Sequence, residues 1–539
     1  MVKEISEQCQ CHDSNKQPQK DRPANREHIK QHFSAKCIIS RCSISTLEEQ
    51  SLQPLRKMSL CTAPPAIVPR SMWGKNKETA RIVIIGAGAS GIAAATRLLE
   101  QGFRNVRILE AEDRIGGRIH TIPFADNAID LGAQWCHGEQ GNVVYERVKE
   151  LDLLDRTGNP TMHFFRSNKE TLSEDQAKAL KNFMDASSTL TDADYEGSVG
   201  DYLTQKYWKE FPTMDRVVAK EILDCIKKMI CSSDACDHLF ELSPQNHLTF
   251  AESEGDPNLN WRGKGYKQFL RVLMNVQDND PEDLGVLKGH VLFNKRIAEI
   301  NWEGADELMI RCWNGEILTA DHVICTVSLG VLKEQHRHLF VPNLPAAKVR
   351  AIDGLKLGTV DKFLLEFSEQ PMPESLLSFN FLWLEADLLE LRGTENFWLE
   401  GICGFHRVGH QPRLIEGWII GAHARHMETL TEEKVLLGLL WLFRKFLSFD
   451  VPHPKRFLRS QWHSHPNFRG SYSFQPTYAD ELRTGRWDLE SPLADVSGRP
   501  RLQFAGEASS RTHFSTVHGA VETGWREADR LNEFYKVRA

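Results

Sequence analysis

The sequence predicts an α/β fold with a Rossmann-like dinucleotide-binding domain and an inserted α+β domain, and three features support this prediction. A β-branched run is followed at once by a glycine-rich turn and a helix, strand-like runs recur far downstream, and helical and strand-like segments lie between them. At 539 residues the chain is too long for one ordinary hydrophobic core. We therefore expect the dinucleotide-binding domain to comprise residues 78–147, 285–335 and 495–539, and the substrate-binding domain to comprise residues 148–284 and 336–494.

The first βαβ unit begins at Arg81–Ile85, a continuous β-branched run typical of a strand buried on both faces of a parallel sheet. Ile92–Glu100 is rich in alanine and leucine and predicts a helix that ends at Gly102. Val106–Leu109 predicts the second strand. Further downstream we expect strands at His322–Val327, Leu502–Ala505, Lys362–Phe367 and Gly417–Ala422, and helices at Asp215–Met229 and Glu432–Phe446.

Residues 1–77 predict a flexible tail, because they are rich in Gln, Lys, Ser and Pro and show no sustained periodicity. Acidic residues in this tail argue against a mitochondrial transit peptide, and it lacks the apolar region of a secretory signal. The chain has no run of about 18 apolar residues, as a membrane span requires, and its last three residues do not resemble a peroxisomal Ser-Lys-Leu ending. We therefore expect a cytoplasmic protein that does not enter the membrane.

The net charge of −7 argues against nucleic-acid binding through a basic face and is compatible with a cationic substrate. The twelve cysteines lack a secretory context and are expected to be reduced. Cys9, Cys11 and His12 have no second ligand pair at zinc-binding spacing, so no metal site is predicted. The sequence leaves both a monomer and a homodimer open.

Between the first predicted strand and helix lies a GxGxxG motif, Gly86-Ala87-Gly88-Ala89-Ser90-Gly91. The first glycine permits the tight turn, the second lets backbone N–H groups approach a pyrophosphate, and the third lets helix and strand pack closely. The pyrophosphate would lie against the helix N-terminus, where the helix dipole favours an anion. We therefore assign Gly86, Gly88, Ala89 and Gly91 to cofactor binding.

Two further features narrow the choice of cofactor to FAD. Glu110 lies nineteen positions after Gly91, at the end of the second strand, where a carboxylate accepts hydrogen bonds from a ribose and repels the 2′-phosphate of NADP. A second glycine pair, Gly116-Gly117, is flanked by Arg114 and Arg118, whose guanidinium groups suit phosphate oxygens. This second block favours FAD over NAD.

Together these motifs resemble the flavin-containing amine oxidases, which share the GxGxxG motif, the carboxylate after the second strand and the Gly-Gly-Arg block. The polyamine oxidase branch, with its spermine and acetylpolyamine oxidases, is the most similar, notably in Ser-Thr-x-His-Gly-Ala and in Gly524–Ala528. Similar blocks follow in family order over about residues 80–535, at Asp130–Gly138, Thr326–Lys333, Gly358–Lys362, Arg469–Ser473, Phe504–Ala508 and Ser515–Ala520.

The resemblance implies an FAD bound without a covalent link, because the cysteine-attached flavin motif and the membrane tail of monoamine oxidases are not found in the sequence. It places Thr516 and Val517 near the flavin ring, and a helix opening after Glu507 would stabilise the charge of the reduced flavin. The remaining implied FAD contacts are Glu110, Arg118, Gly132, Ala133, Gln134, Trp135, Ile297 and Glu507.

Three residues are predicted to serve catalysis. Lys362 matches the lysine that in the family holds a water against flavin N5, and the alternative is a solvated charge. His137 would hold the substrate amine unprotonated through a neutral imidazole, and the alternative is a structural histidine. Tyr472 would form a wall of an aromatic slot, and the alternative is core packing.

The sequence also departs from the polyamine oxidase branch near the predicted substrate end. Cys136 replaces an aliphatic residue, Glu139-Gln140 replaces a small polar residue, and Ser509-Ser510 and His513-Phe514 differ from the usual pairs. A polyamine tunnel is expected to contain carboxylates. The candidates are Glu196, Asp201, Glu252 and Glu254.

The predicted function is oxidation of a polyamine, namely spermine, spermidine or their N-acetylated forms, by hydride transfer to flavin N5. The resulting imine would hydrolyse to an aldehyde and a shorter amine, and oxygen would be reduced to hydrogen peroxide. Two alternatives remain at this stage: an oxidase of another amine or an amino acid, and a catalytically silent FAD-binding scaffold.

Overall fold

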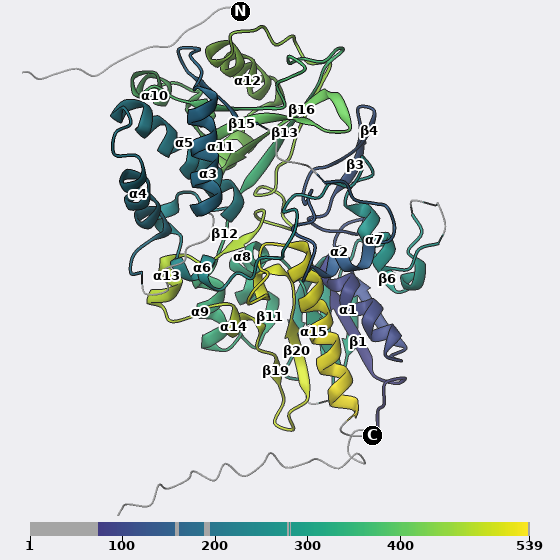
Figure 1. Cartoon of the computed structure of the whole chain (residues 1–539). Helices are drawn as coiled ribbons and strands as arrows, with labels where there is room; N and C mark the ends of the chain where they lie inside the picture. Colours follow the sequence, from purple (N-terminus) through teal and green to yellow (C-terminus); the bar gives the residue numbers. More distant parts are fainter. Residues whose placement is uncertain are drawn as a thin grey trace, which may run out of the picture. The chain divides into compact units, whose positions relative to one another are not determined.

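A six-stranded sheet forms the centre of the part of the chain that carries the glycine motif (Figure 1). The computed structural model describes residues 74–156, 161–187, 195–277, 280, 282–304 and 306–536, so nearly all of the predicted tail lies outside the described residues. The strand order is β19 (Leu493–Ala494), β20 (Pro500–Phe504), β10 (His322–Cys325), β1 (Arg81–Ile85), β2 (Asn105–Leu109) and β6 (Val291–Leu292). All neighbours pair in parallel except β19 and β20. The predicted α/β class is therefore confirmed.

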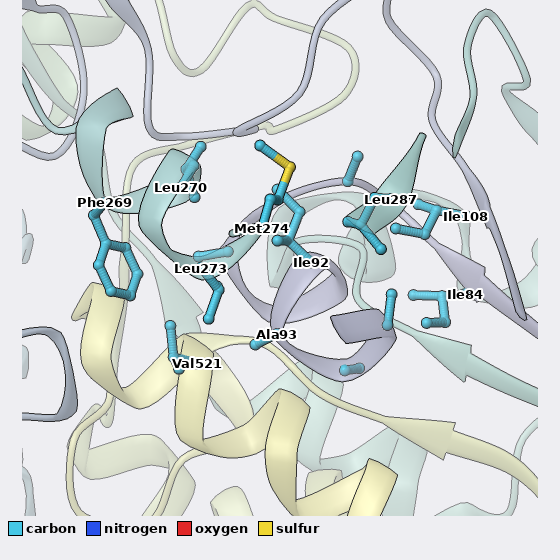
Figure 2. Close-up of a cluster of buried hydrophobic side chains, with 14 of the residues drawn as sticks. Ile84, Ile92, Ala93, Ile108, Phe269, Leu270, Leu273, Met274, Leu287 and Val521 are labelled. Atoms are coloured by element: carbon cyan, nitrogen blue, oxygen red, sulfur yellow. The ribbon is translucent and has the colours of Figure 1, made fainter. Parts of the chain in front are cut away.

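Close packing of two helices fixes the glycine motif against this sheet. Helix α1 (Ala89–Glu100) packs along α15 (Val517–Lys536), and a methyl group added to Gly524 would overlap the carbonyl oxygen of Ser90. Figure 2 shows Ile92 and Ala93 of α1 between Val521 of α15 and the apolar side chains of α7 (Lys267–Leu273). The start of α1 is thus held in place by apolar contacts from α15 and α7.

A second six-stranded sheet carries Lys362, and α12 and α5 cover its two faces. Its order is β17 (Arg456–Arg459), β13 (Val360–Glu366), β16 (Gln411–Ile420), β15 (Ile402–Val408), β14 (Ser378–Leu382) and β5 (His163–Arg166). Phe363 and Leu365 pack with α12 (Glu432–Phe446), whereas Val360 packs with α5 (Arg216–Asp234). Every residue of β13 is buried, including Asp361, Lys362 and Glu366.

The remaining strands form one smaller sheet and two strand pairs. A four-stranded sheet has the order β11 (Phe340–Val341), β7 (Ile297–Asn301), β8 (Leu308–Cys312) and β9 (Ile317–Ala320), and two pairs are β3 (Thr121–Phe124) with β4 (Asn127–Asp130) and β12 (Lys356–Leu357) with β18 (Ser473–Phe474). The other helices are α2 (Val143–Val148), α3 (Glu174–Ser187), α4 (Val199–Glu210), α6 (Pro244–Leu248), α8 (Leu329–Leu339), α9 (Ala346–Gly354), α10 (Glu385–Arg392), α11 (Gly421–Glu428), α13 (Thr477–Glu481) and α14 (Arg486–Glu490).

The predicted elements agree with the structure except at some of their ends. The predicted helix at Glu432–Phe446 is confirmed at both ends, and the helix expected at Asp215–Met229 continues to Asp234. The strand expected at Gly417–Ala422 is wrong in its last two residues, because Gly421 takes a φ of +62° and opens α11. The strand expected at His322–Val327 ends two residues early, at Cys325.

The contact between α1 and α15 predicts the effect of one substitution. Gly524→Ala would force a methyl group against the Ser90 carbonyl, and overpacking of this kind costs about 1–3 kcal/mol. We expect a lower free energy of unfolding, measured from denaturant midpoints. Gly409→Ala is the control, because a methyl group there meets nothing within 4 Å. A Gly524→Ala protein as stable as this control would show that the helices do not pack as described.

Candidate flavin and amine site

One large cavity of about 1110 Å³ is walled by both six-stranded sheets and by the helices around them. This volume exceeds the roughly 300–1,000 Å³ typical of pockets for a drug-sized ligand, so the cavity has room for a dinucleotide and a substrate. It brings together almost all of the residues predicted from the sequence. Those on its wall are Gly86, Gly88, Ala89, Glu110, Arg118, Gly132, Ala133, Gln134, Trp135, His137, Ile297, Lys362, Tyr472, Glu507, Thr516 and Val517.

Among the residues assigned to cofactor binding or catalysis, Gly91 alone does not line the cavity. A methyl group added there would overlap the carbonyl oxygen of Gly86, so this glycine serves the close packing of helix on strand. Gly86 has a φ of +100°, in the left-handed region that favours glycine, and Gly88 precedes α1 as an extended residue without a capping side chain. The first turn of α1 has no acidic residue and borders the cavity, which suits an anion.

Glu110 is held at the carboxyl end of β2 by two backbone donors. Its Oε2 accepts from the Ala87 N–H at 2.6 Å and its Oε1 accepts from the Glu112 N–H at 2.9 Å. Burial raises the pKa of Glu110, although these two N–H groups oppose the rise. Each carboxylate oxygen has a second lone pair, so the group can also accept from ribose hydroxyls.

Arg118 and Glu507 form an ion pair on the cavity wall. Nη1 of Arg118 donates to Glu507 Oε1 at 2.8 Å and to the Ser471 carbonyl at 2.7 Å. Glu507 Oε2 accepts from Ser473 Oγ at 2.6 Å. Burial opposes ionisation of Glu507, but Arg118 and Ser473 outweigh it and hold the pKa of Glu507 below its usual value.

The prediction that a helix begins directly after Glu507 is wrong. A short 3-10 turn occupies Glu507–Ser509, and α15 begins only at Val517. The turn is too short to have a substantial dipole of its own. Thr516 and Val517, which both line the cavity, therefore mark the helix start that faces it.

Lys362 lies in β13, lines the cavity and is only 5% exposed. Its Nζ donates to the Asp130 carbonyl at 2.8 Å and to Gln134 Oε1 at 2.5 Å, and it lies 3.3 Å from Glu416 Oε1. The alternative of a solvated charge is therefore wrong. An ammonium group has three donors, so a water bound by Lys362 would have to share or replace one of these acceptors.

Glu416 and Trp418 complete this network, and the sequence prediction missed both. Antiparallel pairing places Trp418 of β16 opposite Lys362 of β13. The Trp418 indole donates to Glu416 Oε1 at 2.7 Å, and its ring lies 5.5 Å from Lys362 Nζ and stacks on Trp135 at 5.2 Å. A carboxylate within the apolar run of β16 was the available signal.

His137 has a defined tautomer in its neutral form. Its Nδ1 lies 2.8 Å from the Pro257 carbonyl, which can only accept, so Nδ1 carries the proton and Nε2 carries the lone pair. The ring is open to the cavity but lies deep within the protein, and this burial lowers its pKa even though Pro257 opposes the shift. His137 is therefore a neutral hydrogen-bond acceptor at neutral pH.

Tyr472 lines the cavity with a hydroxyl that already has a partner. The hydroxyl donates to the Ser232 carbonyl at the end of α5, and burial raises the pKa of Tyr472. It is therefore a neutral aromatic wall rather than an acid or base.

Of the four candidate tunnel carboxylates, only Glu252 lines the cavity. Asp201 instead belongs to the capping box of α4, where it accepts from the N–H and the hydroxyl of the N-cap Ser198. Glu196 and Glu254 do not border the cavity. Asp185 and Asp234 do line it, and the sequence prediction missed both.

The fold and the cavity define a dinucleotide-binding oxidoreductase. A model of the family described as flavin containing amine oxidoreductase matches residues 89–532, and the chain belongs to this family. The chain is therefore a flavin-dependent enzyme that acts on a small-molecule amine.

Curated relatives agree with this family. The peroxisomal N(1)-acetyl-spermine/spermidine oxidase of Homo sapiens is 32% identical over 505 residues, which cover 84% of this chain and 94% of the relative. Polyamine oxidase 1 of Oryza sativa subsp. japonica is 28% identical over 514 residues, which cover 85% of this chain and 98% of the relative. These relatives confirm the predicted resemblance to the polyamine oxidase branch.

A solved structure of putrescine oxidase matches with a TM-score of 0.62 at 18% identity and covers 84% of this chain and 98% of that one, so the two share a fold. Among the described residues, no helix is both long and apolar enough to cross a lipid bilayer.

The Lys362 network predicts the result of a double substitution. Lys362→Met alone would leave Glu416 as a buried charge without its cation, which typically costs about 3–5 kcal/mol. Lys362→Met combined with Glu416→Gln removes both charges, so we expect it to recover much of the lost free energy of unfolding. Denaturant midpoints of the wild type, both single variants and the double variant give the coupling free energy between the Lys362 and Glu416 side chains. Additive effects of the two substitutions would contradict the buried pair.

Proposed function

We propose that this enzyme is an FAD-dependent polyamine oxidase, which oxidises spermine, spermidine or an N-acetylated form to an aldehyde, a shorter amine and hydrogen peroxide. The observation that carries the proposal is one cavity that combines a dinucleotide turn, a buried lysine network and a neutral histidine. The names of the relatives from Homo sapiens and Oryza sativa support the substrate class. When bound, FAD supplies the acceptor for the substrate hydride and passes the electrons to oxygen.

The residues on the cavity wall fit a noncovalent FAD. The α1 N-terminus with Gly86, Gly88 and Ala89 would hold the pyrophosphate, and Glu110 would hold the ribose. Cys403 lines the cavity, and burial raises its pKa to about 12, so it stays a thiol rather than a thiolate that could attack a flavin. The remaining contacts that we assign are Arg118, Gly132, Ala133, Gln134, Trp135, Ile297, Glu507, Thr516 and Val517.

We also assign the two domains from the strands that each segment supplies. Residues 78–147, 285–335 and 495–539 contribute every strand of the first six-stranded sheet except β19, namely β1, β2, β6, β10 and β20, and they form the proposed FAD-binding domain. Residues 148–284 and 336–494 contribute β5 and β13 to β17, and they form the proposed substrate-binding domain. The expected cytoplasmic location stays a prediction, since the human relative is peroxisomal by its name.

The proposed roles of the catalytic residues follow from their hydrogen bonds. His137 Nε2 would accept from the substrate amine and favour its unprotonated form, whose lone pair assists hydride loss. Lys362 would orient a water by exchanging one of its three acceptors. Tyr472 would confine the alkyl chain, because its hydroxyl is committed to Ser232.

Anaerobic titration of the purified holoenzyme with spermine, spermidine and their acetylated forms tests the proposed function. We expect at least one of these amines to bleach the flavin absorbance, and admission of oxygen to restore it with release of hydrogen peroxide. Bleaching by α-amino acids or monoamines alone would move the enzyme to another substrate class. If the flavin absorbance stays oxidised with every amine, the alternative of a catalytically silent FAD-binding scaffold would replace the proposed function.

His137→Ala tests the role of the neutral imidazole. Loss of a positioned acid or base typically costs 10²–10⁴-fold, so we expect kcat/KM to fall roughly 100-fold. Because the pKa of His137 is lowered, its protonation should impair the wild type only below the usual histidine pKa of about 6.5, and this acidic limb should vanish in the variant. The exposed His410→Ala is the matched control. A His137→Ala enzyme within about threefold of this control would exclude the role.

Glu110→Gln tests the ribose contact. A hydrogen bond to a charged acceptor is worth about 1.5–3 kcal/mol, so we expect the Kd for FAD to rise roughly tenfold. The exposed Glu100→Gln at the end of α1 removes the same charge without touching the cavity. Titration of each apoprotein with FAD gives the two constants. Equal constants for the two variants would rule out Glu110 as a ribose ligand.

A further inference from the structure

Arg486 is a buried cation outside the lining of the cavity. It is the first residue of α14 and is only 3% exposed, and it does not line the cavity. Its Nε, Nη1 and Nη2 are buried and have no hydrogen-bond acceptor among the described residues. A buried guanidinium without an acceptor is costly, so a fold that keeps one points to a functional role.

The ring of Phe514 connects this guanidinium with the cavity. The Arg486 Cζ lies 3.6 Å from the centre of the Phe514 ring, and Phe514 lines the cavity. Phe250, which also lines the cavity, packs edge to face on Phe514 at 5.3 Å. The guanidinium therefore lies directly behind this part of the wall, at a position where the sequence departs from the polyamine oxidase branch.

Glu507 is the carboxylate that acts on Arg486, but it already has other partners. Burial lowers the pKa of Arg486 to about 9, and the charge of Glu507 opposes this shift. Glu507 Oε1 accepts from Arg118 at 2.8 Å, and its Oε2 accepts from the Ser473 hydroxyl at 2.6 Å. The single negative charge of Glu507 is thus shared by two guanidinium groups, which leaves one positive charge uncompensated.

The other charged groups around α14 do not neutralise this charge. Asp488 accepts from a threonine hydroxyl at 2.8 Å, and Glu490 pairs with two other arginines. The elements packed against α14 supply further cations, Lys348 of α9 and Arg501 of β20, and both donate to backbone carbonyl groups. A positive charge therefore remains behind the wall that Phe514 forms.

The histidines beside Phe514 do not cancel this charge either. Burial lowers the pKa of His518 to about 3, so this cavity-lining imidazole is neutral at neutral pH. His513 Nδ1 lies 2.6 Å from Glu522 Oε2, so the carboxylate on this side already has a partner. The guanidinium therefore keeps its effect on the wall.

A cation behind the wall makes a second cation in front of it unfavourable. Like charges separated by one aromatic ring repel each other more strongly in a buried site, where the effective dielectric constant is about 20, than in water, where it is about 80. An aromatic face normally attracts an ammonium group, but Phe514 already binds a guanidinium. An uncharged amine is not subject to this repulsion.

We propose that Arg486 is a positioning residue that acts through Phe514: its charge disfavours a protonated amine at the Phe514 wall and favours the unprotonated nitrogen. Hydride loss needs the lone pair of that unprotonated nitrogen. Thr516, a proposed flavin contact, lies two residues after Phe514, which places the wall near the reacting carbon–nitrogen bond. The inference rests on the proposed amine oxidase function, because it takes the cavity as the substrate site.

Anaerobic stopped-flow reduction of the oxidised holoenzyme over a range of pH tests the proposal. The probe is the amine that bleaches the flavin, used at saturation, together with a second amine of different basicity. The acidic limb of the reduction rate that moves with the basicity of the amine reports the proton on the bound nitrogen. We expect Arg486→Met to move this limb to higher pH by about one unit, which is a tenfold change in the proton affinity of the bound amine.

Two further variants separate the charge from the packing. Arg486→Lys keeps the positive charge, so we expect it to return the limb most of the way to its wild-type position. Arg483→Met is the matched control, because it removes the same charge from an exposed residue three positions earlier. A limb in Arg486→Met that coincides with this control, or one that moves equally in Arg486→Met and Arg486→Lys, would overturn the proposal.

The wild type alone keeps the proposal testable if Arg486→Met does not fold. The bound amine must lose its proton at a lower pH than the free amine, and a wild-type limb at or above the pKa of the free amine would overturn the role of Arg486. Bleaching with an unmoved limb refutes only this role. Absence of bleaching with every amine refutes the oxidase function and this role together.

Discussion

The buried ammonium of Lys362 is the interaction on which the site depends, because it joins the two parts of the cavity. Lys362 belongs to β13 of the second sheet, yet it donates to the Asp130 carbonyl and to Gln134, which lead into the predicted flavin segment. Glu416 compensates its charge from the neighbouring strand. A buried cation is tolerated only with such partners. The segment that contains Asp130 and Gln134 is therefore fixed relative to the strands that carry Lys362 and Glu416.

The N-terminus of α1 distinguishes one end of the cavity from the wall formed by residues 162–258. The first turn of α1 has no acidic residue and suits the phosphates of a dinucleotide, and the nearby Arg118 is paired with Glu507. The wall of residues 162–258 contributes three carboxylates to the lining and no lysine or arginine, which favours a cationic amine. His137 lines the same cavity as a neutral acceptor.

Local motifs were predictable from the sequence, and long-range pairings were not. Arg81–Ile85 and the glycine turn follow from local propensity and backbone freedom, and Glu432–Phe446 follows from helical spacing and its Thr431 cap. The family resemblance supplied Lys362, His137 and Glu507, which no spacing rule would identify. Glu416 and Asp234 were missed because their place depends on the register of β13 with β16 and on five further residues of α5 beyond its expected end.

Acid precipitation of the purified, yellow protein, followed by chromatography of the supernatant, tests whether the cavity holds the proposed FAD without a covalent bond. We expect a colourless pellet and close to one equivalent of FAD per chain in the supernatant. Flavin that stays with the pellet, FMN in place of FAD, or a protein that carries no flavin and takes up none would contradict it.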